Sequence, residues 1–558
     1  MIADDLHQST VQKDVPLSRY FTKLDEVAPL GCIVSGNQAP DLSGVYPPPH
    51  YVYIPRSLPA RLARLREKVI DQLKVFGRLM PAPIRLPNLS FSPGDRALRE
   101  QIRGLSDHRS LDDGMEILQH LIRWFFKGDE VMIERLGQGL SGAKVFLIRI
   151  GAEKEAKSYV IKLGSEASLW KLEQEVKKHE QATNRIGAGH YRRNLPLLHP
   201  CLDSEGKDYI ARYKNWAAVC YDYLGNSDWK GGIVDLETLM VCSNEELSRR
   251  TRETEFFAAY LSDLESLAEG RKRVFTEFLT WLCKEWYQQP GKVERRHKRL
   301  WMTEDCPPRE YPVLPPYRLK GKEKGWILGF LEGRDAEKVA WLRSDWAEHR
   351  DRVGEFVERN DGKTGLPALD VEIPVILSPA HGDLNANNAI LWLHHPDQHF
   401  LIDFPFFQES GHAMQDFARL EVEIVFALME CQAESYNDLP ARDHTYTQLP
   451  LWCEMADHLL TEDGWQGEIK WKSAGFKGNI TQCFELIQLL RQKAKDIQQR
   501  QIDKANIPGF FEEYLPALLY YTLREIGYPS RTVFKRLLAV YSASQILIRL
   551  GQLTAGRF

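Results

Sequence analysis

The sequence predicts an α+β protein of two lobes, in which a small antiparallel sheet precedes a large helical part and follows a helical extension. Three short β-rich runs, separated by glycines and charged turns, occupy residues 129–163. From about residue 226 onward the apolar residues recur mainly at helical spacing, except in the stretch 374–407. Since 558 residues exceed one ordinary core, we expect several structural units.

Composition limits the possible functions. The hydrophobic fraction of 43%, the charged fraction of 27% and the net charge of -4 are typical of a globular protein without a bulk affinity for nucleic acid. No window approaches the apolar length of a membrane span, and the N-terminus lacks a signal-peptide pattern. The nine cysteines are dispersed without a C-x-x-C pair, which fits a reducing compartment. We expect a cytoplasmic protein that binds neither membrane nor nucleic acid.

The first 127 residues contain no motif with evident chemistry. After an irregular start, apolar residues at helical spacing predict amphipathic helices over 58–80 and 111–126. We interpret residues 1–127 as a mostly helical extension that braces the protein or contacts a partner.

A glycine-rich turn follows in "ERLGQGLSGAKVF", residues 134–146. Gly137, Gly139 and Gly142 form a G-x-G-x-x-G pattern, but a β-like run rather than a helix comes next, which disfavours a dinucleotide site. The spacing also misses the Walker motif. What remains is a hairpin whose main-chain N–H groups could cover phosphates, with the hydroxyl of Ser141 at its tip.

Lys162 stands alone inside the apolar strand "YVIKLG". A buried lysine needs a charged partner or a ligand, whereas a lysine at a strand end could simply face solvent. The helix predicted over 166–186 offers carboxylates, of which we favour Glu175 as the partner, with Glu173 as the competitor.

Two aspartates and several amides lie close together in "HGDLNANNAILWL", residues 381–393, and "LIDFPFF", residues 401–407. The apolar flanks predict a loop, a strand, a turn and a second strand. This arrangement would bring Asp383, Asn388 and Asp403 near one point.

The order of these parts is that of a protein kinase: a glycine-rich hairpin, a strand lysine, a helix glutamate, H-x-D-x-x-x-x-N and a strand aspartate. The details "HGD", "IDF" and "GHAMQDFA", the last with Gly411 and Asp416, resemble the aminoglycoside phosphotransferase and choline kinase-like family over roughly 130–430. The stretch "GLSGAKVF" also resembles the kinase-like ternary-complex-associated domains of bacterial conflict systems.

The resemblance implies a bilobal protein-kinase-like fold. Its antiparallel N-lobe would span 128–224 and its helical C-lobe 225–558, with a long insertion around 226–372. Asp416 follows Asp403 by only thirteen residues, which leaves no room for a regulated activation loop.

The resemblance also implies roles for the residues. Asp383 would accept or orient the proton of the substrate hydroxyl, and His381 would brace the loop. Asn388 and Asp403 would bind Mg²⁺, and Lys162 would hold the α- and β-phosphates.

Further expectations concern the ligands. Main-chain groups near Tyr221 and Tyr223 would contact the base of ATP, with GTP as the open alternative. We expect a phosphotransferase acting on a hydroxyl-type acceptor, a small molecule rather than a protein, whose identity the sequence does not give. The alternative is a nucleotide-binding pseudokinase or regulatory module that meets a protein partner through residues 1–127 or 226–372.

Overall fold

The structure is a computed structural model. It describes residues 32–36, 51–55, 86–92, 94–126, 130–138, 143–151, 157–165, 168–186, 195–202, 208–224, 233–241, 267–287, 292–295, 319, 321–333, 345–359, 374–392, 399–434, 449–462, 464–473, 478–500, 509–529 and 531–555. The helix predicted over 58–80 and the turn residues Gly139, Ser141 and Gly142 lie outside the described residues.

The chain divides into two units. Unit 1 contains Met1–Val176 and Leu197–Ser227, and unit 2 contains Lys177–Pro196 and Asp228–Phe558. The finer division at residues 127 and 224 stays a prediction.

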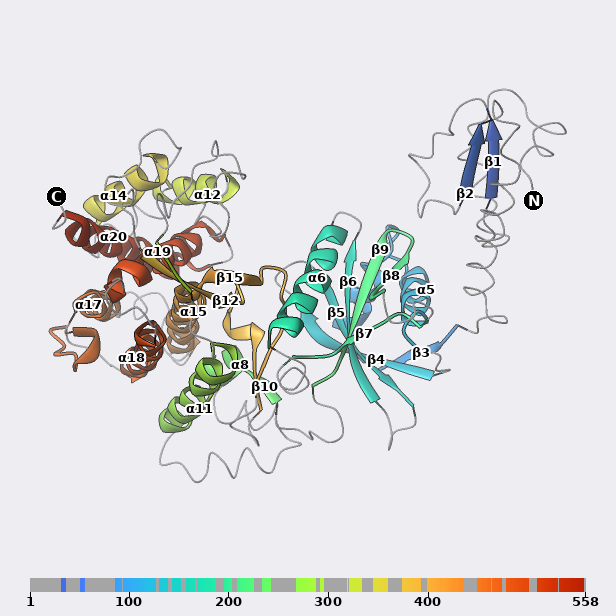
Figure 1. The fold of residues 1–558 in the computed structure, drawn as a ribbon, viewed down its shortest axis with the longest axis horizontal. Coiled ribbons are helices and arrows are strands. Elements are labelled where there is room, and N and C mark those ends of the chain that lie inside the picture. Colours follow the sequence, from blue (N-terminus) through green and yellow to red (C-terminus); the bar gives the residue numbers. More distant parts are fainter. Residues whose placement is uncertain are drawn as a thin grey trace. The chain divides into compact units, whose positions relative to one another are not determined.

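A seven-stranded sheet forms the centre of unit 1, in the order β3-β4-β5-β6-β9-β7, with β8 also paired to β9 (Figure 1). All pairs are antiparallel except β3–β4, and a separate parallel pair joins β1 to β2. The elements of this part of the chain are β1 (Cys32–Gly36), β2 (Tyr51–Pro55), β3 (Asn88–Phe91), α4 (Arg96–Arg103), α5 (Leu111–Ile122), β4 (Glu130–Gln138), β5 (Lys144–Ile150), β6 (Lys157–Ser165), α6 (Leu169–Ile186), β7 (Leu198–His199), β8 (Ile210–Tyr213) and β9 (Trp216–Asp222).

Alternating side chains give the sheet two buried faces. Along β9, Ala218 and Cys220 join a core with α4 and α5, whereas Ala217, Val219 and Tyr221 pack with α6. The helix that the sequence predicted at 111–126, within an extension, is α5 and completes the core of the sheet together with α4.

Beside the helices α4 and α5, the described part of residues 1–127 contains the strands β1, β2 and β3, which the sequence did not predict. The prediction of an antiparallel sheet needs a correction, because β3 lies parallel to β4. Short strands next to prolines carry too few alternating residues to give a sequence signal.

Unit 2 is mostly helical. Its described elements are β10 (Ile233–Asp235), α8 (Leu236–Val241), α11 (Leu267–Trp281), the π-helix η4 (Leu282–Trp286), β11 (Lys292–Arg295), α12 (Gly321–Leu331), α14 (Trp346–Arg359), β12 (Pro374–Ala380), the 3₁₀ helix η7 (Ala386–Asn388), β13 (Ala389–Trp392), β14 (His399–Leu401), β15 (Gln408–His412), α15 (Ala413–Glu434), α17 (Leu449–Leu459), the 3₁₀ helix η8 (Gly464–Gln466), α18 (Gly478–Gln499), α19 (Phe510–Gly527) and α20 (Val533–Ala555).

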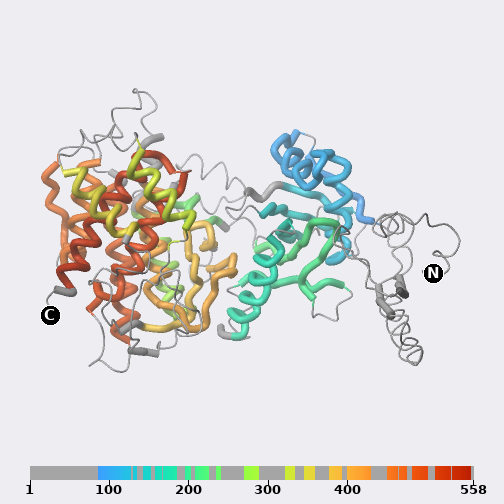
Figure 2. Tube along the Cα trace, turned by 90° about the horizontal axis from the view of Figure 1, so that it is seen from above, coloured from blue at the N-terminus to red at the C-terminus, as the bar shows by residue number. Residues whose placement is uncertain are grey.

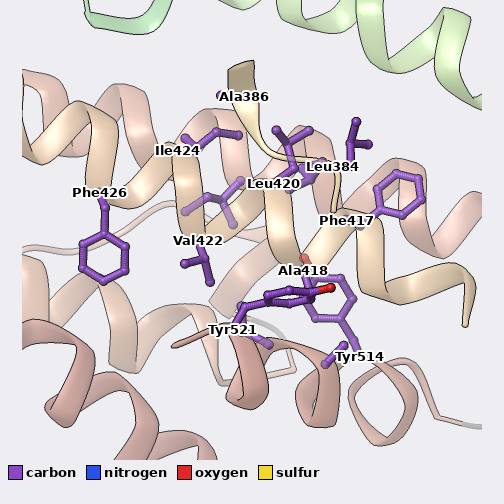
Figure 3. Close-up of a cluster of buried hydrophobic side chains, with 14 of the residues drawn as sticks. Leu384, Ala386, Phe417, Ala418, Leu420, Val422, Ile424, Phe426, Tyr514 and Tyr521 are labelled. Carbon is purple, nitrogen blue, oxygen red and sulfur yellow. The ribbon is translucent and has the colours of Figure 1, made fainter. Parts of the chain in front are cut away.

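The C-terminal helices pack around α15. This helix contacts α18 and α19, and α19 contacts α20, so that these helices gather in one body (Figure 2). Figure 3 shows buried side chains of α15, among them Phe417 and Leu420, near Tyr514 and Tyr521 of α19. The core thereby fixes the position of the helix that follows β15.

Two small sheets of unit 2 hold the segment 374–412. One has the order β10-β13-β14, with the predicted hairpin between β13 and β14, and the other has the order β11-β12-β15. β10 and β11 correct the prediction that 226–372 is helical: each is a short strand that pairs with a distant partner.

The structure therefore shows a mixed α+β protein with mostly antiparallel sheets and many helices. None of the helices in its described portion has the length and apolar character needed to cross a membrane.

Candidate active site

Lys162 is held by a carboxylate and a tyrosine in unit 1. Its Nζ lies 2.7 Å from Oε2 of Glu175 on α6, and both side chains are nearly buried. The hydroxyl of Tyr221 donates to Oε1 of the same carboxylate at 2.6 Å. Glu173 instead pairs with Arg212 at 2.8 Å, because two residues along a helix turn the side chain by about 200°.

Tyr223, which we expect near the base of ATP, uses its main-chain N–H within the protein, where it donates to the main-chain oxygen of Ser158 at 3.2 Å. The side chain of Tyr221 is engaged by Glu175 as described. Contacts of either residue with a nucleotide base stay predictions.

The glycine-rich hairpin is tied to α4. Gly137 lies where the ladder between β4 and β5 shifts register, which is typical of a bulge. At the start of β5, the ammonium of Lys144 donates to the oxygen of Gln101 at 3.2 Å and lies 5.1 Å from the ring centre of Trp216. Burial, followed by the charge of Arg109, lowers the pKa of Lys144. This connection has no signal in the sequence, because no motif marks a lysine that binds a main-chain oxygen.

In unit 2, Asp416 anchors the main chain of the loop that follows β12. Its carboxylate accepts hydrogen bonds from the N–H groups of His381 at 2.6 Å and Gly382 at 2.9 Å, and from the hydroxyl of Tyr287 at 2.8 Å. Burial raises the pKa of Asp416, while His381 and these donors oppose the shift. Three donors thus satisfy a fully buried carboxylate.

Gly382 cannot be replaced by a larger residue without strain. Its φ of 84° lies in the left-handed region, and a Cβ at this position would clash with the main-chain oxygen of Phe406. This explains the glycine of the His-Gly-Asp motif.

His381 is completely buried and braces the loop. Its Nε2 lies 2.9 Å from the oxygen of Ile402, so this nitrogen carries the proton and donates it. The ring also packs against Phe404, at 4.8 Å between centres, and Phe404 lies 5.4 Å from the ring of His179. These contacts agree with a bracing role and leave the ring no exposed surface for proton transfer.

Asn388 is hydrogen-bonded both to Asp383 of the loop and to Ile402, the residue before Asp403. Its side-chain NH₂ donates to the main-chain oxygen of Asp383 at 2.9 Å, and its own main-chain oxygen accepts from Ile402 at 3.1 Å. Asn385 closes the turn between them, because its Oδ1 accepts from the N–H groups of Asn387 and Asn388. The amide is therefore oriented by its nitrogen, which leaves its oxygen as the atom suited to bind a cation.

Asp403 follows directly after Ile402 and has a φ of 65°. A non-glycine residue in the left-handed region is uncommon, because this conformation costs free energy. Such residues persist where the surrounding structure enforces the conformation, and they are frequent at functional sites. Phe404, the next residue, is buried, which holds the backbone of Asp403 in place.

The carboxylate of Asp403 and the amide oxygen of Asn388 are ligands of the kind that a magnesium ion takes when it also binds phosphates. Among the described residues no group of three or more His, Cys, Asp or Glu side chains is placed to bind a metal ion. Mg²⁺ usually takes only one or two carboxylates from a protein, and phosphate oxygens and water complete its shell. One carboxylate, Asp403, and one amide oxygen, Asn388, agree with that requirement.

The carboxylate of Asp383 binds Arg419, a residue for which the sequence predicted no role. Nε of Arg419 lies 3.2 Å from Oδ1 of Asp383, and the guanidinium also reaches Glu423 at 2.6 Å and Glu525 at 3.7 Å. Burial alone would lower the pKa of Arg419, but Glu423, Asp383 and Glu525 outweigh it and raise the pKa. A spacing of four residues between Arg419 and Glu423 was the available sequence signal.

Comparisons with known proteins give two findings. A family model described as Ternary complex associated domain 9 matches residues 365–527, which run from before β12 to the end of α19. The match omits 139–146, the stretch that carries the resemblance to such domains. A solved structure of an ethanolamine kinase from Plasmodium vivax is similar at 10% identity and a TM-score of 0.25, covering 82% of this chain and 86% of that chain. No curated protein matches the chain.

Proposed function

We propose that the chain is a Mg²⁺-dependent phosphotransferase with a protein-kinase-like fold, which transfers the γ-phosphate of ATP or GTP to the hydroxyl of a small acceptor. The observation that carries this proposal is the loop 381–388. Asp416 fixes its main chain, and Asn388 bonds back to Asp383, so that a carboxylate and an amide oxygen are held in one rigid turn.

Each residue then has a separate task. Asp383 orients the acceptor hydroxyl and takes its proton, which is a positioning task in a reaction with a loose transition state. Asn388 and Asp403 hold the metal, which neutralises phosphate charge when bound. Lys162, fixed by Glu175, holds the nucleotide phosphates.

The short connection after Asp403 favours a small acceptor. Residues 403–416 form a turn, β15 and the first turn of α15, and all of them are described. Pro405 also restricts the backbone of Phe404. A segment this short and this packed has no length for a loop that is reordered by phosphorylation.

The metal assignment is tested by replacing Asp403 with alanine. We expect Asp403→Ala to weaken Mg²⁺-dependent ATP binding by at least about 10-fold, since metal affinity depends on each ligand and its support. The measurement is the Kd for ATP, obtained by calorimetric titration with and without Mg²⁺. Asp351→Ala, a surface change in α14, is the control and should bind as the wild type does. Unchanged Mg·ATP affinity in folded Asp403→Ala would refute the assignment.

A second function has one observation in its favour. The matched family is described as ternary complex associated, which suggests a module that works within an assembly. A nucleotide-binding regulator would keep its cellular activity in Asp383→Asn and lose it in Lys162→Ala, because occupancy alone would matter. An enzyme would lose its activity in both variants.

A further inference from the structure

Arg419 and Asp416 act on the same loop from one helix. They lie three residues apart on α15, and so on the same face of that helix. Asp416 binds the main chain of His381 and Gly382, while Arg419 binds the side chain of Asp383. One face of α15 thus holds both the path of the loop and the carboxylate that it carries.

The guanidinium itself is fixed from its other side. Only 7% of the Arg419 side chain is exposed, and Glu423 and Glu525 bind it from α15 and α19. Glu525 is in turn paired with Arg531 at 2.7 Å, and the ring of Tyr521 lies 5.6 Å from the guanidinium carbon. A group held by this many partners has little freedom to change its direction.

The three carboxylates around Arg419 differ in exposure. The side chains of Glu423 and Glu525 are 10% and 1% exposed, whereas that of Asp383 is 28% exposed. The ion pair engages Asp383 through Oδ1. The accessible carboxylate is therefore that of Asp383, on the loop, and Arg419 binds only one of its two oxygens.

We propose that Arg419 is a positioning residue, which holds Asp383 by Oδ1 and thereby directs Oδ2 to the acceptor hydroxyl. This inference rests on the proposed function. The competing explanation is that Arg419 only neutralises Glu423 and Glu525 within the helical core. The two explanations differ in one expected result. If Arg419 acts through Asp383, replacing Arg419 should no longer change kcat once Asp383 has itself been replaced.

The test is a double-mutant cycle on Mg·ATP hydrolysis with water as the acceptor. Arg419→Lys keeps a cation beside Glu423 and Glu525 but loses the planar fork that fixes Asp383. We expect kcat to fall on the order of 10-fold in Arg419→Lys, since small misplacements of reacting groups are costly. The Kd for Mg·ATP should not change. In the Asp383→Asn background the same substitution should cause no further loss, because the two residues act as one unit.

Two further variants protect the cycle from a folding artefact. Arg419→Met combined with Glu423→Gln removes one cation and one anion together, and should lower kcat more than Arg419→Lys does. Arg491→Lys, a buried arginine paired with Glu421, is the matched control and should leave kcat unchanged. If Arg419→Lys lowered kcat equally in the wild type and in Asp383→Asn, or raised the Kd for Mg·ATP in parallel, the positioning role of Arg419 would be overturned. The proposed function would not be affected by either result. A wild-type protein that binds Mg·ATP without any turnover would overturn the proposed function, and this inference with it.

Discussion

Two buried arginines of unit 2 bind carboxylates of α15 or its neighbours in different ways. Arg491 of α18 grips Glu421 with two nitrogens, at 2.8 and 2.7 Å, and Tyr514 donates to the same carboxylate at 2.7 Å. Arg491 also donates to the main-chain oxygen of Leu459. Every side chain of this ion pair is at most 4% exposed. This network is closed and braces α15, α18 and α19.

Arg419 forms an open network. It divides its donors among three carboxylates, and one of them, Asp383, is partly exposed and lies on the loop after β12. Tyr521 is placed near Arg419 as Tyr514 is near Arg491, but its hydroxyl reaches the main-chain oxygen of Gly382 at 3.4 Å rather than a carboxylate. The difference between the two networks is that Arg419 has a carboxylate partner that is partly exposed, Asp383, whereas the partner of Arg491, Glu421, is buried.

The largest expected effect concerns the closed network. Arg491→Met leaves Glu421 buried without its cation, so we expect the free energy of unfolding to fall by about 3–5 kcal/mol. Chemical denaturation followed by circular dichroism measures this change. Molecules that remain folded should hydrolyse Mg·ATP at the wild-type rate. A loss below about 1 kcal/mol, or a change of turnover without a change of stability, would break the comparison.

A smaller expected effect is the pH dependence of stability that comes from His179, a buried residue near Phe404 and not part of either arginine network. His179, which packs against Phe404, is buried, and this burial lowers its pKa from 6.5 to about 4. The unfolded chain therefore binds more protons between these values, so stability is present above pH 6.5 and is lost as the pH falls toward 4.

We expect His179 to contribute roughly 3 kcal/mol to this loss, from the size of the pKa shift. His179→Gln should flatten the dependence of the unfolding free energy on pH between 6.5 and 4, measured by denaturation at several pH values. Arg491→Met should keep the wild-type slope in this window. An equal slope in wild type and His179→Gln would show that the histidine is not held neutral.

Local patterns predicted some of the contacts around the candidate site. Lys162 stood alone in an apolar strand, and the favoured partner, Glu175, is the glutamate that binds it, whereas Glu173 pairs with Arg212. The two strands predicted from apolar runs after the His-Gly-Asp loop are β13 and β14, which form the expected hairpin. In each case the interacting residues lie within one supersecondary unit.

Long-range pairing could not be predicted. Arg419 meets Asp383 because β15 and α15 bring them together across 36 residues, and Glu525 arrives from another helix. β10 and β11 are strands because of their partners β13 and β12, not because of their own three or four residues. Likewise, the apolar face of α5 predicted a helix, but not that this helix covers a sheet.

The central claim is that Asp383 serves phosphoryl transfer, and Asp383→Asn tests it most directly. The amide keeps the shape of the side chain but lacks the negative charge and the basic oxygen. The measurement is release of labelled phosphate from Mg·ATP by the purified 558-residue chain, together with its affinity for Mg·ATP, and Asp496→Asn serves as the control. We predict unchanged nucleotide affinity and a turnover lower by roughly 10²-fold or more, the usual contribution of a general base. Turnover equal to that of the wild type would contradict the claim.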